Sequence, residues 1–261
     1  MLAPSLISVI AQSLYDAERG AEPVERLTGQ YNGLDTPSAY AVQERYAAMR
    51  RKAGARVVGR KIGCTSKVIQ ELFKIETPDF GHLFDDMQRR DNAAIDLTRL
   101  IEPMVEPEIA FRLAAELRGP GVTAADVLRA TGTVMPALEI IDSRIRHWGI
   151  AFEDTVADNG SSALFVLGVE QEPDAGFDFA AESVSFRRDG VEVDADQAAA
   201  VLGNPLNSVA WLANAIAEFD RGLAAGEIVL SGSITKAARV EGAASYEAVF
   251  STIGRVGCAF V

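Results

Sequence analysis

The first fifty residues show the spacing of two amphipathic helices. Apolar residues recur at helical intervals over residues 5–19, with charged side chains between them, which predicts a helix with one buried face. Thr36-Pro37 supplies a cap and a first-turn proline for a second helix that ends at Gly54, and residues 27–34 before it are expected to form a loop. We expect the polar residues of the second helix to form a solvated face, namely Gln43, Glu44, Arg50, Arg51 and Lys52.

After residue 56 the pattern changes to short runs of β-branched and aromatic residues. Such runs occupy residues 56–64, 105–111, 135–142, 164–169, 183–194, 227–234 and 246–261. One further helix begins at Asn204-Pro205. Helices first and strands later predict an α+β fold rather than a regular alternation of strands and helices. We divide the chain into a helical N-terminal region, residues 1–75, and a β-rich region, residues 76–261, that is expected to carry the chemistry.

Two glutamates, Glu106 and Glu108, stand one residue apart in an extended apolar run. Successive side chains on a strand point to opposite faces, so these two carboxylates should leave the same face. Two buried anions repel, and each raises the pKa of the other unless a cation or a proton lies between them. Glu139 adds a carboxylate from a second apolar run, and three such groups on neighbouring strands suit Mg²⁺ or Mn²⁺. The alternative is an exposed edge with its acids in water, but the apolar residues after Glu108 favour burial.

The composition narrows the classes of partner and cofactor. The chain has 37 Asp and Glu against 25 Lys and Arg, a net charge of −12, and without a basic cluster to neutralise phosphates we expect no nucleic-acid partner. Two histidines and no C-x-x-C motif argue against zinc, and Cys64 and Cys258 are expected to be reduced thiols. The N-terminus lacks the basic start of a signal peptide and no apolar run reaches membrane-spanning length, so we expect a cytoplasmic protein without membrane contact.

Seven motifs, in order between about residues 56 and 235, carry a resemblance to a known family. They are G-R-K-I-G-C-T-S, T-P-D-F-G, V-E-P-E-I-A-F, P-A-L-E-I-I-D-S-R-I, D-T-V-A-D-N, G-N-P-L-N-S-V-A-W-L-A-N and G-E-I-V-L-S-G-S-I. Together they resemble the hydratase/decarboxylase branch of the fumarylacetoacetate hydrolase superfamily. The resemblance implies an α+β fold in which a mixed β-sheet and β-roll core stands beside an N-terminal helical region.

The resemblance also implies a set of site residues. Its metal ligands, for one Mg²⁺ or Mn²⁺, are Glu106, Glu108 and Glu139; its catalytic residues are Lys61 and Asp79; and its substrate-binding residues are Asn159, Ser161 and Ser233. From the residues alone, Lys61 could be an exposed strand lysine and Asp79 a turn residue that bonds its own backbone. The glycines on both sides of Arg60-Lys61-Ile62 favour close approach of a ligand to that strand.

The activity implied by the resemblance is hydration of a small dienoate. We expect water to add to 2-hydroxypenta-2,4-dienoate (2-keto-4-pentenoate) in aromatic meta-cleavage catabolism, with the metal ion and Lys61 stabilising the enolate. The alternatives are decarboxylation of 4-oxalocrotonate and hydration of a related 2-oxo-enoate or dioate. A C–C bond hydrolase would need a histidine–carboxylate pair, which the segments of His82 and His147 do not suggest, and an accessory subunit would not need the ligands. We also expect a homo-oligomer that can associate with other enzymes of the pathway.

Overall fold

The computed structural model describes the backbone of residues 1–261 and all side chains except those of residues 68, 69 and 72. Its helices are α1 (Pro4–Gly20), α2 (Leu27–Gln30), α3 (Thr36–Lys52), α4 (Lys67–Phe73), α5 (Ala124–Ala130), α6 (Phe152–Ala157) and α7 (Pro205–Ala217). Its strands are β1 (Val57–Gly63), β2 (Asp79–Phe84), β3 (Gln88–Arg90), β4 (Ala93–Ile95), β5 (Met104–Leu113), β6 (Thr131–Ile141), β7 (Ser162–Leu167), β8 (Ser183–Arg188), β9 (Val191–Gln197), β10 (Ile228–Leu230), β11 (Ala238–Arg239), β12 (Ala244–Phe250) and β13 (Arg255–Phe260). Among the helices of the described chain, none has the length and apolar character needed to cross a bilayer.

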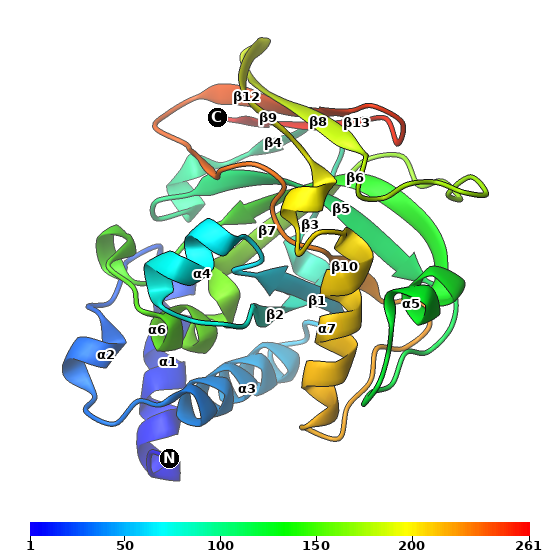
Figure 1. The fold of residues 1–261 in the computed structure, drawn as a ribbon. Helices are drawn as coiled ribbons and strands as arrows, with labels where there is room; N and C mark the ends of the chain where they lie inside the picture. The colour runs from blue at the N-terminus through cyan, green and yellow to red at the C-terminus, as the bar shows by residue number, and fades with distance from the viewer.

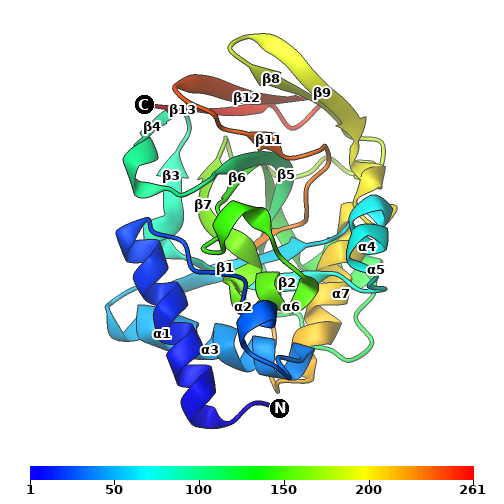
Figure 2. The ribbon, with the colours of Figure 1, turned by 90° about the vertical axis from the view of Figure 1, so that its left-hand side faces the viewer.

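Two β-sheets form the body of the molecule. The larger has the order β2-β1-β10-β5-β6-β7-β3, with β11 added to β5, and the smaller has the order β4-β13-β12-β8-β9. Helices α1, α2 and α3 lie at one end of the molecule and the smaller sheet lies at the other, with the larger sheet between them (Figure 1). The view turned by 90° shows the same order (Figure 2). Strand β1 pairs with β10 and β2, so the larger sheet includes residues on both sides of position 75.

The two faces of the larger sheet bury different sets of apolar residues. On β5, Ala110 belongs to the core that includes α1 and α3, whereas Ile109 and Phe111 belong to the core that includes α7 and the smaller sheet. Glu106 and Glu108 lie four and two positions before Ala110 on the same strand. Strand alternation therefore directs both carboxylates toward the face covered by the N-terminal helices.

The N-terminal segment differs from expectation in two respects. Residues 27–34, expected to be a loop, contain the short helix α2. The prediction of a solvated polar face on α3 is wrong for Gln43 and Arg50, which are both buried. The Gln43 side-chain amide donates to the carbonyls of Phe80 and Val156, each at 2.8 Å, and Arg50 pairs with Glu18 of α1. These partners are distant in the sequence, so helical spacing alone does not reveal them.

Candidate metal centre and active site

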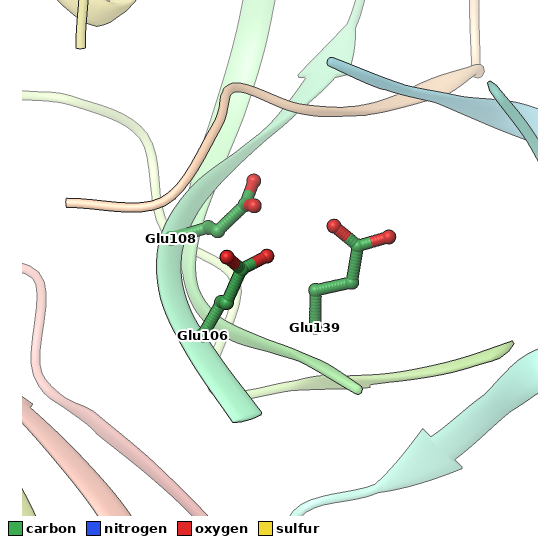
Figure 3. A group of neighbouring side chains, drawn as sticks. All are labelled: Glu106, Glu108 and Glu139. Carbon is green, nitrogen blue, oxygen red and sulfur yellow. The ribbon is translucent and has the colours of Figure 1, made fainter. Parts of the chain in front are cut away.

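The three glutamates predicted as metal ligands lie together at the centre of the larger sheet. Strands β5 and β6 are antiparallel, and their register places Glu106 opposite Glu139 and Glu108 opposite Ala137. One carboxylate oxygen from each glutamate lies within 4.8 Å of the other two. Figure 3 shows the three carboxylates facing a common space, two from one strand and one from its neighbour.

The chemistry of this glutamate trio fits a hard divalent cation. Glu108 Oε2 accepts a hydrogen bond from the Gly232 N–H at 2.7 Å, but among the described residues no hydrogen bond reaches Glu108 Oε1 or either oxygen of Glu139, and all three atoms are buried. Burial raises the pKa of Glu106 to about 7, with Glu139 and Asp79 adding to the effect against the opposing charge of Lys61. Burial and the charges of Glu139 and Glu106 likewise raise the pKa of Glu108. Buried carboxylate oxygens without donors are the ligands that Mg²⁺ and Mn²⁺ prefer.

Lys61 brings a buried positive charge to the trio. Its Nζ lies 3.3 Å from Glu139 Oε2 and donates to the Gly160 carbonyl at 3.0 Å, and the residue is only 4% exposed. Burial alone would lower the pKa of Lys61, but Glu139, Asp79 and the other two glutamates together raise it above its ordinary value. Lys61 is therefore an ammonium ion held inside the protein, and the interpretation of it as an exposed strand lysine is wrong.

Asp79 stands beside Lys61, at the start of β2 and opposite Gly63 of β1. A Cβ atom on Gly63 would lie 2.2 Å from Asp79 Oδ1 and 3.3 Å from Lys61 Nζ, so glycine is needed where these groups meet. Burial raises the pKa of Asp79, as does the charge of Glu139, while Lys61 and hydrogen bonds from the Gly63 N–H and the Thr155 hydroxyl oppose the rise. Thr155 therefore also belongs to this site, although the sequence analysis did not select it. Its place in the D-T-V-A-D-N motif could have indicated it.

The loop between α6 and β7 carries two of the predicted substrate-binding residues. Asn159 and Ser161 are nearly fully buried, and the Ser161 hydroxyl lies 3.5 Å from the Thr155 hydroxyl and 3.2 Å from Asp158 Oδ2. The Asn159 amide is engaged with the backbone of His82 through both its oxygen and its nitrogen. The loop thus places a serine hydroxyl near Asp79, while Asn159 is held by β2.

Ser233, the third predicted substrate-binding residue, lies one residue after Gly232, whose N–H bonds Glu108. The Ser233 hydroxyl donates to the Thr235 carbonyl at 2.8 Å. Its role toward a substrate stays a prediction.

The sequence and the fold of the chain are similar to those of known proteins. No family model matches the chain. It is 40% identical over 259 residues to 2-keto-4-pentenoate hydratase of Paraburkholderia xenovorans (strain LB400), covering 99% of this chain and 96% of the relative. It is 42% identical over 230 residues to 2-hydroxyhexa-2,4-dienoate hydratase of Comamonas testosteroni, covering 87% of each chain. The structure of 4-oxalocrotonate decarboxylase from Pseudomonas putida G7, complexed with magnesium and adipate, superposes with a TM-score of 0.97 at 31% identity, covering 100% of this chain and 99% of that one.

The chain belongs to the hydratase/decarboxylase branch of the fumarylacetoacetate hydrolase superfamily. The predicted α+β fold and the predicted family are both confirmed. The matches to the Paraburkholderia hydratase and to the decarboxylase cover 99% and 100% of the chain, so both include the N-terminal helices.

In this member of the branch, a buried ion pair supports the loop at the site. Arg144 is 2% exposed, and its Nε donates to Asp158 Oδ1 at 2.6 Å. The same guanidinium donates to the carbonyls of Asp142 and Ser162 at 3.0 and 2.8 Å. Burial raises the pKa of Asp158 to about 6, although Arg144 opposes the rise. Sequence reasoning missed this pair because its members lie in two separate motifs with nothing to indicate that they touch.

The hydratase/decarboxylase chain also contains a histidine–carboxylate pair, which the sequence did not suggest. His82 Nε2 lies 3.1 Å from Glu44 Oε1, and Arg221 donates to both Glu44 oxygens at 2.5 and 2.8 Å. Burial opposes ionisation of Glu44, but the bonds from His82 and Arg221 lower its pKa to about 2. His82 lies three residues after Asp79 on β2, so the two side chains leave opposite faces of the strand. The pair therefore lies on the opposite face of β2 from Asp79. From there it cannot activate a water molecule beside the glutamates.

Proposed function

We propose that the protein adds water to 2-hydroxypenta-2,4-dienoate, giving 4-hydroxy-2-oxopentanoate, with Mg²⁺ or Mn²⁺ held by Glu106, Glu108 and Glu139. The observation that carries the proposal is the glutamate trio, with Glu108 and Glu139 buried, next to a buried ammonium. It occurs in a chain 40% identical to a 2-keto-4-pentenoate hydratase over almost its entire length. The three carboxylates supply negative charge, and buried oxygens such as Glu108 Oε1 and Glu139 Oε1, which accept no hydrogen bond from the described residues, supply the atoms that such an ion needs. A divalent ion held there supplies a Lewis acid toward a 2-oxo carboxylate.

Lys61 stabilises the negative charge that develops on the 2-oxygen of the substrate. Its ammonium is fixed by Gly160 and Glu139 before the substrate arrives, so no reorganisation is needed at the moment of reaction. The charge is maintained at neutral pH because the surrounding carboxylates raise the pKa of Lys61. A preorganised cation of this kind, in a site that excludes water, typically contributes about 10²- to 10³-fold to the rate.

Asp79 moves protons between carbon and water. Its pKa is raised by burial, so its protonated form is more populated near neutral pH than that of an exposed aspartate, which is the condition for alternating between general acid and general base. The Thr155 hydroxyl orients the carboxyl group, and Ser161 lies within reach of that hydroxyl. We assign Ser161 to the carboxylate end of the substrate and Ser233 to the wall of the pocket near Glu108.

Decarboxylation of 4-oxalocrotonate is the second candidate, because a decarboxylase is matched at a TM-score of 0.97 and 31% identity. Both reactions develop negative charge on the same 2-oxygen, so the glutamates and Lys61 serve either one. The difference lies at the distal end of the substrate, where one reaction needs a positioned water molecule and the other needs room for a second carboxylate. The higher identity to two hydratases, 40% and 42%, favours hydration.

The test is turnover by the purified protein with three substrates. Consumption of 2-hydroxypenta-2,4-dienoate in Mg²⁺ or Mn²⁺, its loss after chelation and its return when the ion is restored would support the proposal. A preference for 2-hydroxyhexa-2,4-dienoate would extend the substrate by one carbon. Release of carbon dioxide from 4-oxalocrotonate, without hydration of either dienoate, would show that the protein is a decarboxylase and not a hydratase. If none of the three substrates is turned over in a metal-dependent way, both proposed activities are rejected.

A further inference from the structure

We propose that Asn159 is a positioning residue, which holds the Gly160 carbonyl against Lys61, rather than a ligand of the substrate carboxylate. This inference rests on the proposed function, because it concerns the ammonium that stabilises the reacting oxygen. It departs from the role that the family resemblance implies for Asn159, and the reason lies in what its side-chain amide contacts.

The Asn159 amide completes the edge of the larger sheet. Strand β2 is the last strand on that side of the sheet. Asn159 Oδ1 accepts from the His82 N–H at 2.7 Å, and Nδ2 donates to the His82 carbonyl at 3.0 Å. An asparagine amide has a donor and an acceptor side by side, so it bonds this backbone residue as a neighbouring strand would. The Asn159 amide oxygen and one of its N–H groups are thus bonded to the backbone of β2, and the residue is only 1% exposed, which favours a structural role over contact with a substrate.

The backbone beside this clamp adopts an uncommon conformation. Asn159, Gly160 and Ser161 have φ values of 57°, 62° and 53°, in the left-handed region that non-glycine residues seldom adopt. The turn also packs against β2 at Gly81, where a Cβ atom would lie 2.3 Å from the Asn159 carbonyl oxygen. A left-handed turn persists only when its surroundings hold it, and the two hydrogen bonds from the Asn159 side chain do so.

This arrangement fixes the position of the Gly160 carbonyl group. Gly160 sits in the middle of the turn, and its carbonyl accepts from Lys61 Nζ at 3.0 Å. An ammonium has three N–H groups, of which one is directed to Gly160 and another toward Glu139 at 3.3 Å. Without the Gly160 carbonyl, the ammonium would be free to move toward Asp79 and the glutamates. The clamp therefore keeps the third N–H available for the substrate oxygen.

The test compares Asn159→Ala with a matched control elsewhere in the chain. Asn214 makes the same kind of clamp on α7, where its Oδ1 accepts from the Val122 N–H and its Nδ2 donates to the Val122 carbonyl, each at 2.9 Å. Asn214→Ala removes the same two kinds of hydrogen bond, at a partly buried position on an element outside the site. Each variant is assayed for kcat and KM with the substrate that the wild type turns over, and for binding of 2-oxopentanoate, an unreactive 2-oxo acid, by calorimetry in Mg²⁺. Thermal unfolding is measured on each protein.

We expect Asn159→Ala to lower kcat about ten- to a hundredfold, as misplacement of a catalytic group by about 1 Å does, while the Kd of 2-oxopentanoate changes by less than about threefold. Asn214→Ala should lower the thermal stability and keep its kcat. Asn159→Asp retains the acceptor for the His82 N–H and should likewise lower kcat with little change in the Kd of 2-oxopentanoate. It replaces the alanine variant in the test if that variant does not fold.

Two results would overturn the inference. A rise of about tenfold or more in the Kd of 2-oxopentanoate would show that Asn159 binds the carboxylate, because that is the effect of removing a hydrogen bond to a charged group. An equal loss of kcat in Asn159→Ala and Asn214→Ala would show a general effect of stability. Failure of the proposed function is a separate outcome, since it is seen in the wild type as absence of dienoate hydration, whereas the variants are compared with whichever substrate the wild type uses.

Discussion

Glu106→Gln should make the metal-free protein more stable. The substitution keeps the size of the side chain and removes a carboxylate that repels Glu108 and Glu139. In the fold the pKa of Glu106 is raised from 4.5 to about 7, a difference worth about 3 kcal/mol when the group is ionised. Its side chain is partly exposed, so water screens part of this cost, and we expect a gain of about 2 kcal/mol at pH 8.

The pH dependence of this gain has a definite sign. A carboxyl group whose pKa is raised in the fold costs nothing below its unfolded pKa of 4.5, where it is protonated in both states, and costs most above pH 7, where it must ionise in the fold. The advantage of Glu106→Gln should therefore be fully present at pH 8 and largely lost at pH 5. Chemical denaturation of both proteins in a chelator at these two pH values measures it.

Added metal should reverse the order of stability. At a Mg²⁺ concentration 100 times the Kd, the wild type gains about 2.7 kcal/mol, whereas Glu106→Gln, with one anionic ligand fewer, gains much less. A variant no more stable than the wild type in chelator at pH 8 would refute the claim that burial and the acidic neighbours make ionised Glu106 destabilising. A variant that responds to Mg²⁺ as strongly as the wild type would refute the role of Glu106 as a ligand.

Three further predictions concern the same site. Lys61→Met should lower kcat by about 10²- to 10³-fold while Mg²⁺, measured by calorimetry, binds at least as tightly, since a neighbouring cation has been removed; weaker Mg²⁺ binding would contradict this. Asp79→Asn should lower kcat by about 10²- to 10⁴-fold without changing the Kd for Mg²⁺, and retention of near-wild-type kcat would remove Asp79 from the mechanism. Because Glu106 takes up a proton near pH 7, the Mg²⁺ affinity of the wild type should fall up to about tenfold per pH unit below 7, and a flat titration from pH 8 to pH 6 would count against it.

Strand alternation was sufficient to predict two of the three glutamates of the candidate metal centre. Glu106 and Glu108 share a face because they are two residues apart, and their apolar neighbours indicated burial. That Glu139 joins them depends on the β5–β6 register, which the sequence suggested only through a third carboxylate in a second apolar run. The family resemblance supplied Lys61 and Asp79, for which the residues alone left a choice between chemistry and an ordinary strand or turn.

The sequence pattern did not reveal contacts between residues that are distant in the chain. Gln43 and Arg50 occupy the polar side of an amphipathic helix, yet both are buried because other elements supply acceptors for their donors. The bond between His82 and Glu44 joins a strand to a helix 38 residues earlier in the chain. Asn159 stands next to Ser161 in a loop of the site, and only the tertiary structure shows that its amide bonds β2.

Several expectations from the sequence stay predictions. They are the boundary between residues 75 and 76, the homo-oligomeric state, association with other enzymes of the pathway and a cytoplasmic location. Strand β1 is relevant to the boundary between residues 75 and 76. It joins residues 57–63, through β10, to the sheet that carries the glutamates.

The central claim is that three glutamates hold a divalent ion that acts on a 2-oxo acid. Its most direct test is a crystal structure of the wild type grown with Mn²⁺ and 2-oxopentanoate, with data collected at the manganese absorption edge. We predict one anomalous peak bounded by the carboxylates of Glu106, Glu108 and Glu139, with the 2-oxo acid beside Lys61. A peak elsewhere, or a 2-oxo acid bound away from the three glutamates, would contradict the account.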